Sequence, residues 1–580
     1  MICKVLTPRL LQYATCVALF FILGSCVKKD AQNIVNQEVP PDSTAVLWYK
    51  NGIIYTLDVE VFKDSDNDGV GDFKGLISKL DYIDSLGADV IWLSPFQPTP
   101  NKDDGYDISN YYDVDQRLGS LADFKIFVDS AKRRNIKIII DLVLNHTSDQ
   151  HPWFLSARKD KNSPFHDWYV WSKQRPKNAD QGMVFPGVQQ SIWKLDSISH
   201  EYYYHRFYDF QPDLNVQNPA VRKEIRKIVA FWMNTGIKGF RVDAVPFVIE
   251  VPDTVKENFD HQFEIITALR AQVDSIDKEA VILGEANVMP DENKDYFGHH
   301  AEGIQMMFNF YVNQYLFYAL ATSEIKPLQK ALNETNKMPK TAEWGQFLRN
   351  HDEVDLGRLT EKQRDKVYKA FGPEKQMQLY DRGIRRRLAP MLGNKKELIE
   401  LAYSVLLSLP STPVMRYGDE LGMGDDLRLK ERLSVRTPMQ WDDSKNAGFT
   451  SNKNPVLPVI DFGDFTYSKL NVKNELTDSS SLLKWTKKMI MLRKKCPEIA
   501  FGTWEILDSG SDHVLVMKYS WQGKSLITIH NFSQEDQQIK IKVDDFADHA
   551  PINQVTGNPI EIKNELATTT LKGLEYQWLR

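Results

Sequence analysis

The stretch GFRVDAV, residues 239–245, places an arginine and an aspartate inside an otherwise apolar run. Arg241 and Asp243 are two residues apart, so on a β-strand both side chains point to the same face. A guanidinium next to a carboxylate favours the ionised form of that carboxylate. The stretch therefore predicts a carboxylate that stays charged although it lies away from water.

Polar side chains also follow other strand-like runs, each at the C-terminal end of its run. Glu285 lies near the end of the run AVILGEAN, and Asp352 ends the run EWGQFLRNHD. A single carboxylate in such a place is usually a helix cap or a structural hydrogen-bond partner. Three carboxylates at equivalent strand ends instead indicate a shared catalytic site. The polar residues at these ends are Asn145, His146, Asp243, Glu285, His351 and Asp352.

The elements that would position these residues alternate along the chain from residue 46 onward. Strand-like runs are separated by amphipathic helical stretches, a pattern typical of a parallel (β/α)8 TIM barrel, whose catalytic groups lie at the C-terminal strand ends. A doubly wound open sheet is the alternative, but it usually carries a glycine-rich phosphate turn, which this sequence lacks. The runs cover residues 53–62, 88–96, 137–146, 239–245, 280–287, 303–310, 343–352 and 413–420.

The spacing of the runs divides the chain into a barrel, an insertion and a C-terminal domain. Residues 147–218, after the third run, are too many for an ordinary connection, so we expect an inserted loop domain that covers the site. After a last barrel helix near residues 481–500, alternating stretches such as SLITIHNF and QQIKIKV predict an antiparallel β-sandwich at 501–580. The barrel itself is expected at residues 46–146 and 219–500.

Residues 1–26 are typical of an export signal. Lys4 and Arg9 precede an apolar run that is short for a membrane-spanning helix and ends in LGSC. These last four residues resemble the lipobox of bacterial lipoproteins, which implies cleavage before Cys26 and lipidation of that cysteine. Residues 27–45 would then form a polar tether. We expect an exported bacterial lipoprotein, anchored to a membrane only by its lipid and facing the periplasm or the cell surface; a plain secretory peptide is the alternative.

The charge of the chain bears on its partners, and its cysteine content bears on disulfide bonds. The 580 residues include 78 acidic and 72 basic side chains, which give a net charge of −6 without long blocks of one sign. This balance argues against a nucleic-acid partner. Cys496 lies alone beyond the signal and the anchor, so no internal disulfide is expected, and we interpret it as a small buried hydrophobic residue. The oligomeric state stays unknown at this stage.

The stretch DSDNDGVGD at residues 64–72 is a candidate cation site. Its acidic residues alternate, Gly69 allows a tight turn, and the spacing resembles the first part of an EF-hand loop, although Gly75 replaces the final glutamate of such a loop. Closely spaced carboxylates repel one another unless a cation lies between them. A solvated acidic turn is the alternative. The expected ligands are Asp64, Asp66, Asp68, the carbonyl of Val70, and Asp72.

Several ordered motifs carry a family resemblance. DLVLNH, GFRVDAV, GEAN and FLRNHDE resemble the four conserved blocks of the α-amylase superfamily, glycoside hydrolase family 13. QPDLN at 211–215 resembles the fifth block in the form found in oligo-1,6-glucosidases and trehalose synthases. Longer stretches such as GIRRRLAPML and RTPMQW are most similar to the trehalose synthase branch. The resemblance extends from about Trp48 to the C-terminus.

The resemblance implies an enzyme that breaks α-glucosidic bonds with retention of configuration. Such an enzyme uses one ionised carboxylate as the nucleophile and one protonated carboxyl as the acid/base. Asp243 matches the family's nucleophile, Glu285 matches its acid/base, and Asp352 matches the third carboxylate, which binds sugar hydroxyls. Arg241 would keep Asp243 ionised.

Other residues match sugar-binding positions of the family. His146 and His351 match histidines that hydrogen-bond the sugar preceding the scissile bond, and Tyr106 matches the aromatic platform beneath that sugar. Asp107, paired with Arg436, resembles the arrangement by which exo-acting members hold the non-reducing end. If this pair closes the pocket, the enzyme takes short substrates from one end, whereas an endo-acting enzyme with an open cleft would lack such a pair.

The resemblance also implies calcium as a structural ion. It places one Ca²⁺ in the loop at residues 64–72. Asn145 and Asp213 match ligands of a second Ca²⁺, with Glu250 as a weaker candidate. No organic cofactor is implied.

These observations predict a retaining glycoside hydrolase with transglucosylation capacity, acting on maltose, maltooligosaccharides or related short α-glucans through a covalent glucosyl-Asp243 intermediate. One alternative is an isomerase that interconverts maltose and trehalose, which requires a closed pocket without water. Export favours a degradative role, and Gly284 and Arg416 depart from the usual trehalose synthase pattern. The other alternative is a non-catalytic sugar-binding lipoprotein, against which the presence of all three carboxylates argues.

Overall fold

The computed structural model of the chain describes residues 40, 43–253, 260–542, 551–560, 562–563 and 566–580. The predicted export signal, its Cys26 and most of the predicted tether lie outside the described residues. Among the residues that are described, no helix is both long enough and apolar enough to cross a membrane.

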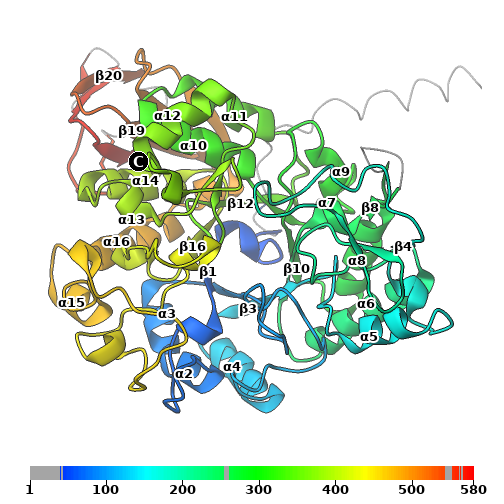
Figure 1. Cartoon of the computed structure of the whole chain (residues 1–580). Coiled ribbons are helices and arrows are strands. Elements are labelled where there is room, and N and C mark those ends of the chain that lie inside the picture. Colours follow the sequence, from blue (N-terminus) through cyan, green and yellow to red (C-terminus); the bar gives the residue numbers. More distant parts are fainter. Residues whose placement is uncertain (1–39, 41–42, 254–259, 543–550, 561, 564–565) are drawn as a thin grey trace, which may run out of the picture.

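Eight parallel strands close into a barrel in the order β1-β16-β12-β11-β10-β7-β3-β2 (Figure 1). Each strand overlaps one of the eight predicted runs, so the (β/α)8 prediction is confirmed and the open-sheet alternative is wrong. Most strand residues are buried, because side chains fill the barrel on one face and helices cover the other. The barrel strands are β1 (Ile54–Leu57), β2 (Val90–Leu93), β3 (Lys137–Leu142), β7 (Gly239–Val242), β10 (Val281–Gly284), β11 (Met306–Phe308), β12 (Glu343–Phe347) and β16 (Thr412–Arg416).

Helices surround the barrel, and α6 (Pro219–Met233) shows why they form where they do. The side chain of Asn218 accepts a hydrogen bond from the N–H of Ala220 at 2.9 Å, and proline occupies the first helical position. Its apolar residues recur at helical spacing and are buried against the barrel. The same layer includes α2 (Phe73–Ser78), α3 (Leu80–Leu86), α4 (Leu121–Lys132), α8 (Glu264–Ile276), α10 (Phe310–Thr322), α11 (Lys326–Thr335), α12 (Glu361–Phe371), α14 (Lys396–Ser408) and α16 (Leu482–Lys494).

A glycine brings β7 close to β10. Gly239 has a φ of +144°, and a Cβ atom at this position would lie 2.0 Å from the carbonyl oxygen of Val281. Only glycine tolerates both this backbone conformation and this approach. The pairing then runs in register to Val242 and Gly284, the last residues of the two strands. The residues that follow, Asp243 and Glu285, therefore emerge side by side.

Two regions extend from the barrel. Between β3 and α6 the chain forms α5 (Pro152–Lys159) and an antiparallel sheet of β4 (Trp171–Ser172), β6 (Tyr202–Tyr204) and β5 (Trp193–Leu195). After α17 (Pro497–Phe501) the chain forms a sheet in the order β17-β18-β19-β23 and a second sheet in the order β20-β22-β21, near α14 in Figure 1. Cys496, between α16 and α17, is buried and carries a free thiol.

The strands of these C-terminal sheets are antiparallel, and apolar side chains of both sheets form one buried cluster. This is the packing expected of two layered sheets. Their bounds are β17 (Thr503–Leu507), β18 (Val514–Trp521), β19 (Lys524–Asn531), β20 (Gln537–Lys542), β21 (Ile562–Lys563), β22 (Leu566–Leu571) and β23 (Tyr576–Leu579).

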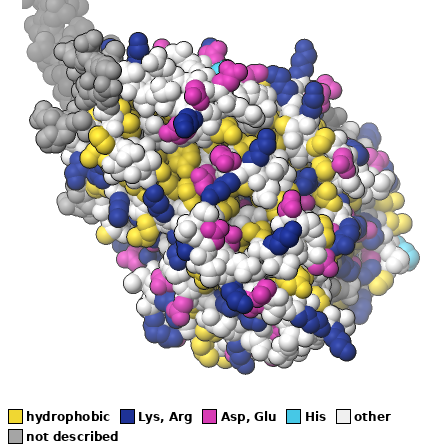
Figure 2. Space-filling view, turned by 90° about the vertical axis from the view of Figure 1, so that its left-hand side faces the viewer, with side chains coloured by type: hydrophobic (Ala, Val, Ile, Leu, Met, Phe, Trp, Pro, Cys, Tyr) yellow, Lys and Arg dark blue, Asp and Glu magenta, His cyan; other side chains and the backbone are white. Residues whose placement is uncertain are grey.

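One face of the molecule, on the side of α14 and α16, can be followed in Figure 2. Lys and Arg side chains alternate there with Asp and Glu side chains, without a large patch of one sign. The described residues of this face therefore form no stripe of positive charge of the kind that nucleic-acid binding requires.

Candidate active site

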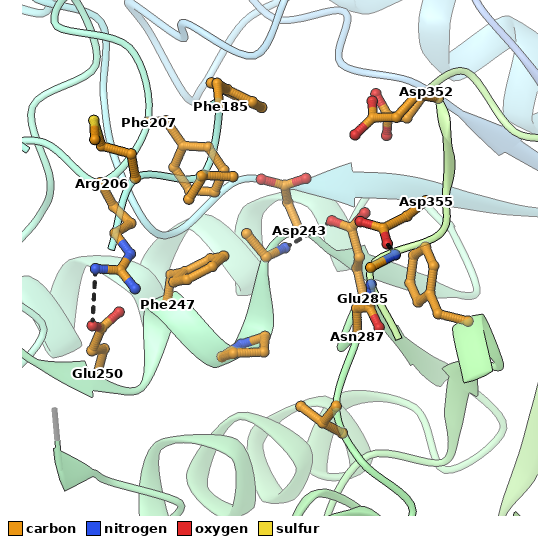
Figure 3. Close-up of a pocket in the computed structure, with 18 of the residues that line it drawn as sticks. Phe185, Arg206, Phe207, Asp243, Phe247, Glu250, Glu285, Asn287, Asp352 and Asp355 are labelled. Atoms are coloured by element: carbon orange, nitrogen blue, oxygen red, sulfur yellow. Dashed lines mark hydrogen bonds and ion pairs between the residues drawn. The ribbon is translucent and has the colours of Figure 1, made fainter. Parts of the chain in front are cut away.

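A pocket of about 780 Å³ opens at the C-terminal ends of the barrel strands. Asp243 follows β7, Glu285 follows β10, and Asp352 lies in the loop after β12. Figure 3 shows all three among the side chains that line this pocket. The structure thus brings the three predicted carboxylates together. The predicted rings that also line the pocket are those of Tyr106, His146 and His351.

Arg241 on β7 is completely buried and contacts three carboxylates, one on β3 and two that directly follow β7 and β10. Its Nη1 lies 2.7 Å from Asp141 Oδ1 and 2.7 Å from Asp243 Oδ1, and its Nη2 lies 2.8 Å from Glu285 Oε2. A retaining mechanism needs its two carboxyl groups about 5 to 5.5 Å apart. Because the Arg241 guanidinium contacts both Asp243 and Glu285, these two carboxyl groups lie close together. The same guanidinium favours the ionised state of Asp243.

The residue after Asp243 has a backbone conformation that is uncommon for alanine. Ala244 has a φ of +50° and a ψ of +42°, and the left-handed region costs a non-glycine residue on the order of 1–2 kcal/mol. This turn directs the N–H of Ala244 to Glu285, whose Oε2 accepts the hydrogen bond at 3.1 Å. The local strain therefore orients Glu285 relative to Asp243.

Burial shifts the titration of both carboxyl groups. It raises the pKa of Asp243 to about 6, although the charge of Arg241 acts in the opposite direction. It also raises the pKa of Glu285 to about 7, again against the effect of Arg241. Asp243 therefore ionises at a lower pH than Glu285, so that one group can attack while the other still carries a proton.

Asp352 is held by one histidine and two arginines. His351 Nε2 lies 3.0 Å from its Oδ2, while Arg432 Nη1 and Arg436 Nη2 lie 2.8 Å and 3.1 Å from its Oδ1. Burial alone would raise the pKa of Asp352, but these contacts outweigh burial and hold the pKa well below its ordinary value. Asp352 is thus ionised and suited to accept hydrogen bonds from sugar hydroxyls.

Tyr106 and His351 form a stacked platform at the base of the pocket. Their ring centroids are 5.5 Å apart, and the Tyr106 hydroxyl lies 2.8 Å from His351 Nε2. His146 Nε2 lies 3.2 Å from the backbone oxygen of Tyr106. Burial lowers the pKa of His146 and of His351 to about 4, so both imidazoles are neutral at neutral pH.

The predicted pairing of Asp107 with Arg436 is wrong. Asp107 accepts hydrogen bonds from the backbone N–H groups of Lys102 at 3.1 Å and Asp103 at 3.0 Å, and from Thr99 Oγ1 at 3.0 Å. Its carboxylate therefore shapes the turn of residues 99–107 and is turned away from the arginine. This is the ordinary structural role of an aspartate within a turn.

Arg436 has other partners behind the pocket wall. It pairs with Asp104 and with Asp352, and its Nε donates to the backbone oxygen of His351 at 2.9 Å. Asp104 has a φ of +53°, so the chain turns sharply just before the DGYD motif is complete. This turn, which the sequence pattern did not reveal, directs Asp104 rather than Asp107 to Arg436.

Asp103 and Arg432 do lie in the pocket, and the sequence analysis missed both. Arg432 Nη2 lies 2.6 Å from Asp103 Oδ1, and Arg432 also contacts Asp352. Both residues line the pocket. Arg432 and Arg436 lie in the same short segment of the chain, and no sequence pattern indicates which of the two lines the pocket.

Asp141 was also missed, although a signal for it existed. It lies in the buried run KIIIDL, and β3 pairs with β7 so that Asp141 stands opposite Arg241. An acid in a buried strand next to an arginine-bearing strand is the same pattern that identified Arg241 and Asp243. The Tyr106 hydroxyl donates to Asp141 at 3.0 Å, which ties the platform to this network.

Three of the four acidic residues in the loop at 64–72 approach one another. Carboxylate oxygens of Asp64, Asp66 and Asp72 all lie within 4.8 Å of each other. Asp68 is outside this group, and its Oδ1 accepts the N–H of Val70 at 2.7 Å. The set of three offers only oxygen ligands, which is the donor type that Ca²⁺ prefers.

The residues predicted for a second cation also meet, with an arginine nearby. The backbone oxygen of Asn145 accepts a hydrogen bond from the N–H of Leu214, the neighbour of Asp213, at 2.8 Å. Arg206 Nη1 lies 3.5 Å from Glu250 Oε1, the contact drawn at the left of Figure 3. Burial raises the pKa of Asp213 well above its ordinary value and that of Glu250 to about 7. Both carboxyl groups therefore lie where positive charge is too scarce to offset burial.

Comparisons with known proteins agree on one family. Residues 54–502 match the model of the alpha-amylase catalytic domain. The chain is 40% identical over 525 residues to a trehalose synthase/amylase of Mycolicibacterium smegmatis, covering 88% of each chain. It is 32% identical over 550 residues to an oligo-1,6-glucosidase of Parageobacillus thermoglucosidasius, covering 84% of this chain and 91% of the relative.

A solved structure agrees with these sequence matches. The isomaltulose synthase of Klebsiella sp. LX3 aligns with a TM-score of 0.75 and 26% identity, covering 92% of this chain and 99% of that one. The family and branch predicted from the motifs are thus confirmed. The chain belongs to the alpha-amylase family of glycoside hydrolases, as an enzyme of the branch that includes trehalose synthases and oligo-1,6-glucosidases.

Proposed function

We propose that this enzyme is a retaining, exo-acting α-glucosidase with transglucosylation capacity. It removes glucose from the non-reducing end of maltose and short α-glucans. The observation that carries this proposal is the arrangement of the pocket lining: Asp243 and Glu285 share one guanidinium, and the ion pair of Asp103 and Arg432 lines the same pocket. In this proposal the ion pair closes the pocket, so that a substrate can place only one glucose unit beyond the bond to be cleaved.

The first chemical step forms a covalent intermediate. The carboxylate of Asp243 attacks the anomeric carbon, and Glu285 transfers its proton to the glycosidic oxygen. The bond between the anomeric carbon and the glycosidic oxygen then breaks. The products are a β-linked glucosyl ester on Asp243 and a free sugar with a new hydroxyl group. The ionised Asp352 binds hydroxyls of the reacting glucose, and the nearby negative charges of Asp352 and Asp243 stabilise the positive charge that develops on the ring.

The second step releases the glucosyl group. Glu285, now ionised, takes a proton from water or from a sugar hydroxyl, and the resulting oxygen nucleophile attacks the anomeric carbon. The ester bond to Asp243 breaks and the carboxylate is regenerated. Attack by water gives α-glucose, and attack by a sugar gives a longer α-glucoside. Two inversions at the same carbon leave the configuration retained.

A second candidate function is interconversion of maltose and trehalose. The name and the 40% identity of the relative from Mycolicibacterium smegmatis favour it. In this reaction the released glucose must stay in the pocket, turn, and attack the glucosyl ester before water does. The two candidates therefore share every catalytic residue and differ in the fate of the freed glucose.

Product analysis separates the two candidates. Purified enzyme is given maltose, and the products and their anomers are followed by NMR, with Asp243→Ala as the inactive control. We expect α-glucose as the first product, joined by longer α-glucosides at high maltose concentration. Trehalose that accumulates beyond glucose would establish the isomerase and contradict the hydrolase.

The pH dependence of kcat/KM for maltose should be bell-shaped, with its maximum between about pH 6 and 7. On the acid side Asp243 gains a proton and can no longer attack, and on the alkaline side Glu285 loses the proton that the leaving group needs. Since the two carboxyl groups interact, each limb of the pH profile reports the titration of the pair and not of one residue alone. Initial rates across the pH range test this, and Glu285→Gln should lose the alkaline limb. Activity that keeps rising into alkaline solution would contradict the assignment.

We further propose that Ca²⁺ binds at two structural sites. Asp64, Asp66 and Asp72 support the first, because their oxygens converge in one loop. Asn145 and Asp213 support the second, with Glu250 as a weaker candidate, because burial raises the pKa of Asp213 well above its ordinary value and a bound cation would offset that burial. A bound ion would supply positive charge and fix the loops around the pocket.

Removal of calcium should lower the temperature of unfolding. A ligand present at 100 times its Kd stabilises the folded state by about 2.7 kcal/mol. Differential scanning calorimetry with excess calcium and with chelator measures the shift in Tm. Asp64→Asn and Asp213→Asn should each lower the number of bound calcium ions by one and reduce the shift. Equal Tm values with and without calcium would exclude stabilising sites.

We also propose that Cys26 carries a lipid and that the enzyme acts outside the cytosol, tethered to a membrane. The sequence LGSC at residues 23–26 supports this, together with the polar segment that follows it. A tethered α-glucosidase would release glucose from short glucans near the membrane surface.

A further inference from the structure

Next to Phe185 and Arg432 of the pocket lining, segments far apart in the sequence meet in one cluster. Tyr208 comes from the region between β3 and α6. Tyr380 comes from the hairpin of β14 (Gln378–Leu379) and β15 (Gly383–Ile384), and Glu431 begins the short helix η7 (Glu431–Val435). We call Tyr208, Tyr380 and Glu431 the latch.

Both tyrosines of the latch converge on the glutamate. The Tyr208 hydroxyl donates to Glu431 Oε2 at 2.6 Å, and the Tyr380 hydroxyl lies 3.2 Å from the same oxygen. The two hydroxyl oxygens are 3.0 Å apart. Hydrogen bonds to an ionised carboxylate are among the stronger ones in proteins. The latch therefore joins three loops at one oxygen atom.

The latch does not line the pocket, but it supports two residues that do. The Phe185 ring packs on Tyr208 with centroids 4.6 Å apart and on Tyr380 with centroids 4.7 Å apart. The Arg432 guanidinium lies 5.3 Å from the Phe185 centroid, on its ring face. Phe185 and Arg432 are pocket-lining residues. Any effect of the latch on substrates must therefore act through these two side chains.

The backbone of the latch is strained at both loops. Tyr380 has a φ of +54° and Glu431 a φ of +45°, although neither is glycine. Such conformations persist only where surrounding contacts hold them, and they collect at sites where a precise direction of the chain is needed. Arg432 directly follows Glu431, so the direction of its side chain toward Asp103 and Asp352 depends on this turn.

We propose that Tyr208, Tyr380 and Glu431 are positioning residues that hold Phe185 and Arg432 as the end wall of the pocket, and so restrict the enzyme to substrates with a free non-reducing end. This proposal rests on the proposed α-glucosidase function. Without the latch, Arg432 would be held only by its two carboxylates, and a chain could extend past the wall. The pocket would then become a cleft.

End-blocked substrates test this proposal directly. The full-length enzyme is given p-nitrophenyl maltoheptaoside, either free or with its non-reducing end blocked by a 4,6-ethylidene group, and the products are separated by chromatography. We expect the wild type to act on the free substrate alone. Tyr208→Phe/Tyr380→Phe, which keeps both rings and removes both hydroxyls, should cleave the blocked substrate internally. Its KM for maltose should rise by about tenfold, with a smaller change in kcat.

Matched variants separate this role from a general effect on folding. Tyr112 donates to Glu224 at 2.6 Å on the outside of the barrel, so Tyr112→Phe removes a similar bond and should keep end specificity. Glu431→Gln retains an acceptor oxygen and should also keep it, whereas Glu431→Leu should lose it. If the double variant does not fold, the two Glu431 variants decide the question.

The outcomes distinguish the two proposals. A wild type that releases no glucose from maltose would overturn the proposed function itself. A wild type that releases glucose but already cleaves the blocked substrate would overturn the end wall. Latch variants that fold, keep the wild-type KM and still reject the blocked substrate would overturn the latch alone.

Discussion

Replacement of Asp243 by asparagine is expected to lower kcat/KM for maltose by at least about 10⁴-fold, the range found when a catalytic nucleophile is removed. The amide of asparagine cannot attack the anomeric carbon. It also leaves Arg241 with two carboxylate partners, Asp141 and Glu285, in a completely buried place. Steady-state kinetics of the purified variant measure the loss, and sugar binding by calorimetry should remain because the side chain keeps its shape.

An external nucleophile provides the control for Asp243. In Asp243→Ala the missing side chain leaves room for azide, which should attack α-glucosyl fluoride from the same side and give β-glucosyl azide and fluoride. An Asp243→Asn variant with activity within about tenfold of the wild type would show that another group is the nucleophile. A protein in which this change alters no function at all would support the sugar-binding lipoprotein instead.

Replacement of Glu285 by alanine should lower kcat/KM for maltose by about 10³-fold, because general acid catalysis contributes about 10² to 10⁴. The loss should be much smaller for α-glucosyl fluoride in the first step, since fluoride leaves without a proton. Azide should then accelerate the second step and give α-glucosyl azide, because it needs no general base. Parallel kinetics with both substrates, with and without azide, measure this difference.

A second pocket carboxylate serves as the comparison for Glu285. Glu292 lines the same pocket, and its Oε2 accepts the N–H of Met289 at 2.8 Å, outside the network of Arg241. Glu292→Ala should therefore show no rescue by azide and no selective loss for maltose over the fluoride. Equal losses for both substrates in Glu285→Ala would contradict the assignment of Glu285 as the acid/base.

The barrel could be predicted from the sequence because its signals are local. Each strand is a short apolar run, and α6 carries its N-cap, its proline and its apolar face within residues 218–233. Arg241 lies on β7 and Asp243 directly follows it, two residues later. This spacing alone predicts that their side chains share one face. Their convergence with Glu285 and Asp352 followed from the rule that active sites lie at the C-terminal strand ends.

The rest of the site depends on contacts between loops, which carry no periodic signal. Asp103, Asp104 and Asp107 lie within five residues, yet the first two each pair with an arginine and Asp107 bonds only within its own turn. The left-handed conformation of Asp104 contributes to this difference. Arg432 and Arg436 differ only in how their loop folds against Asp352. The latch joins residues that are 51 to 223 positions apart, so no local pattern could indicate it.

The most direct test of the account is to trap the covalent intermediate. The enzyme is incubated with 5-fluoro-α-glucosyl fluoride, which forms the glucosyl ester but slows its release, and is then digested and analysed by mass spectrometry. We expect one labelled peptide that contains GFRVDAV, with the label on Asp243, and no label in Asp243→Asn. A label on another residue, or full inactivation without any covalent sugar, would contradict the assignment of Asp243 as the nucleophile.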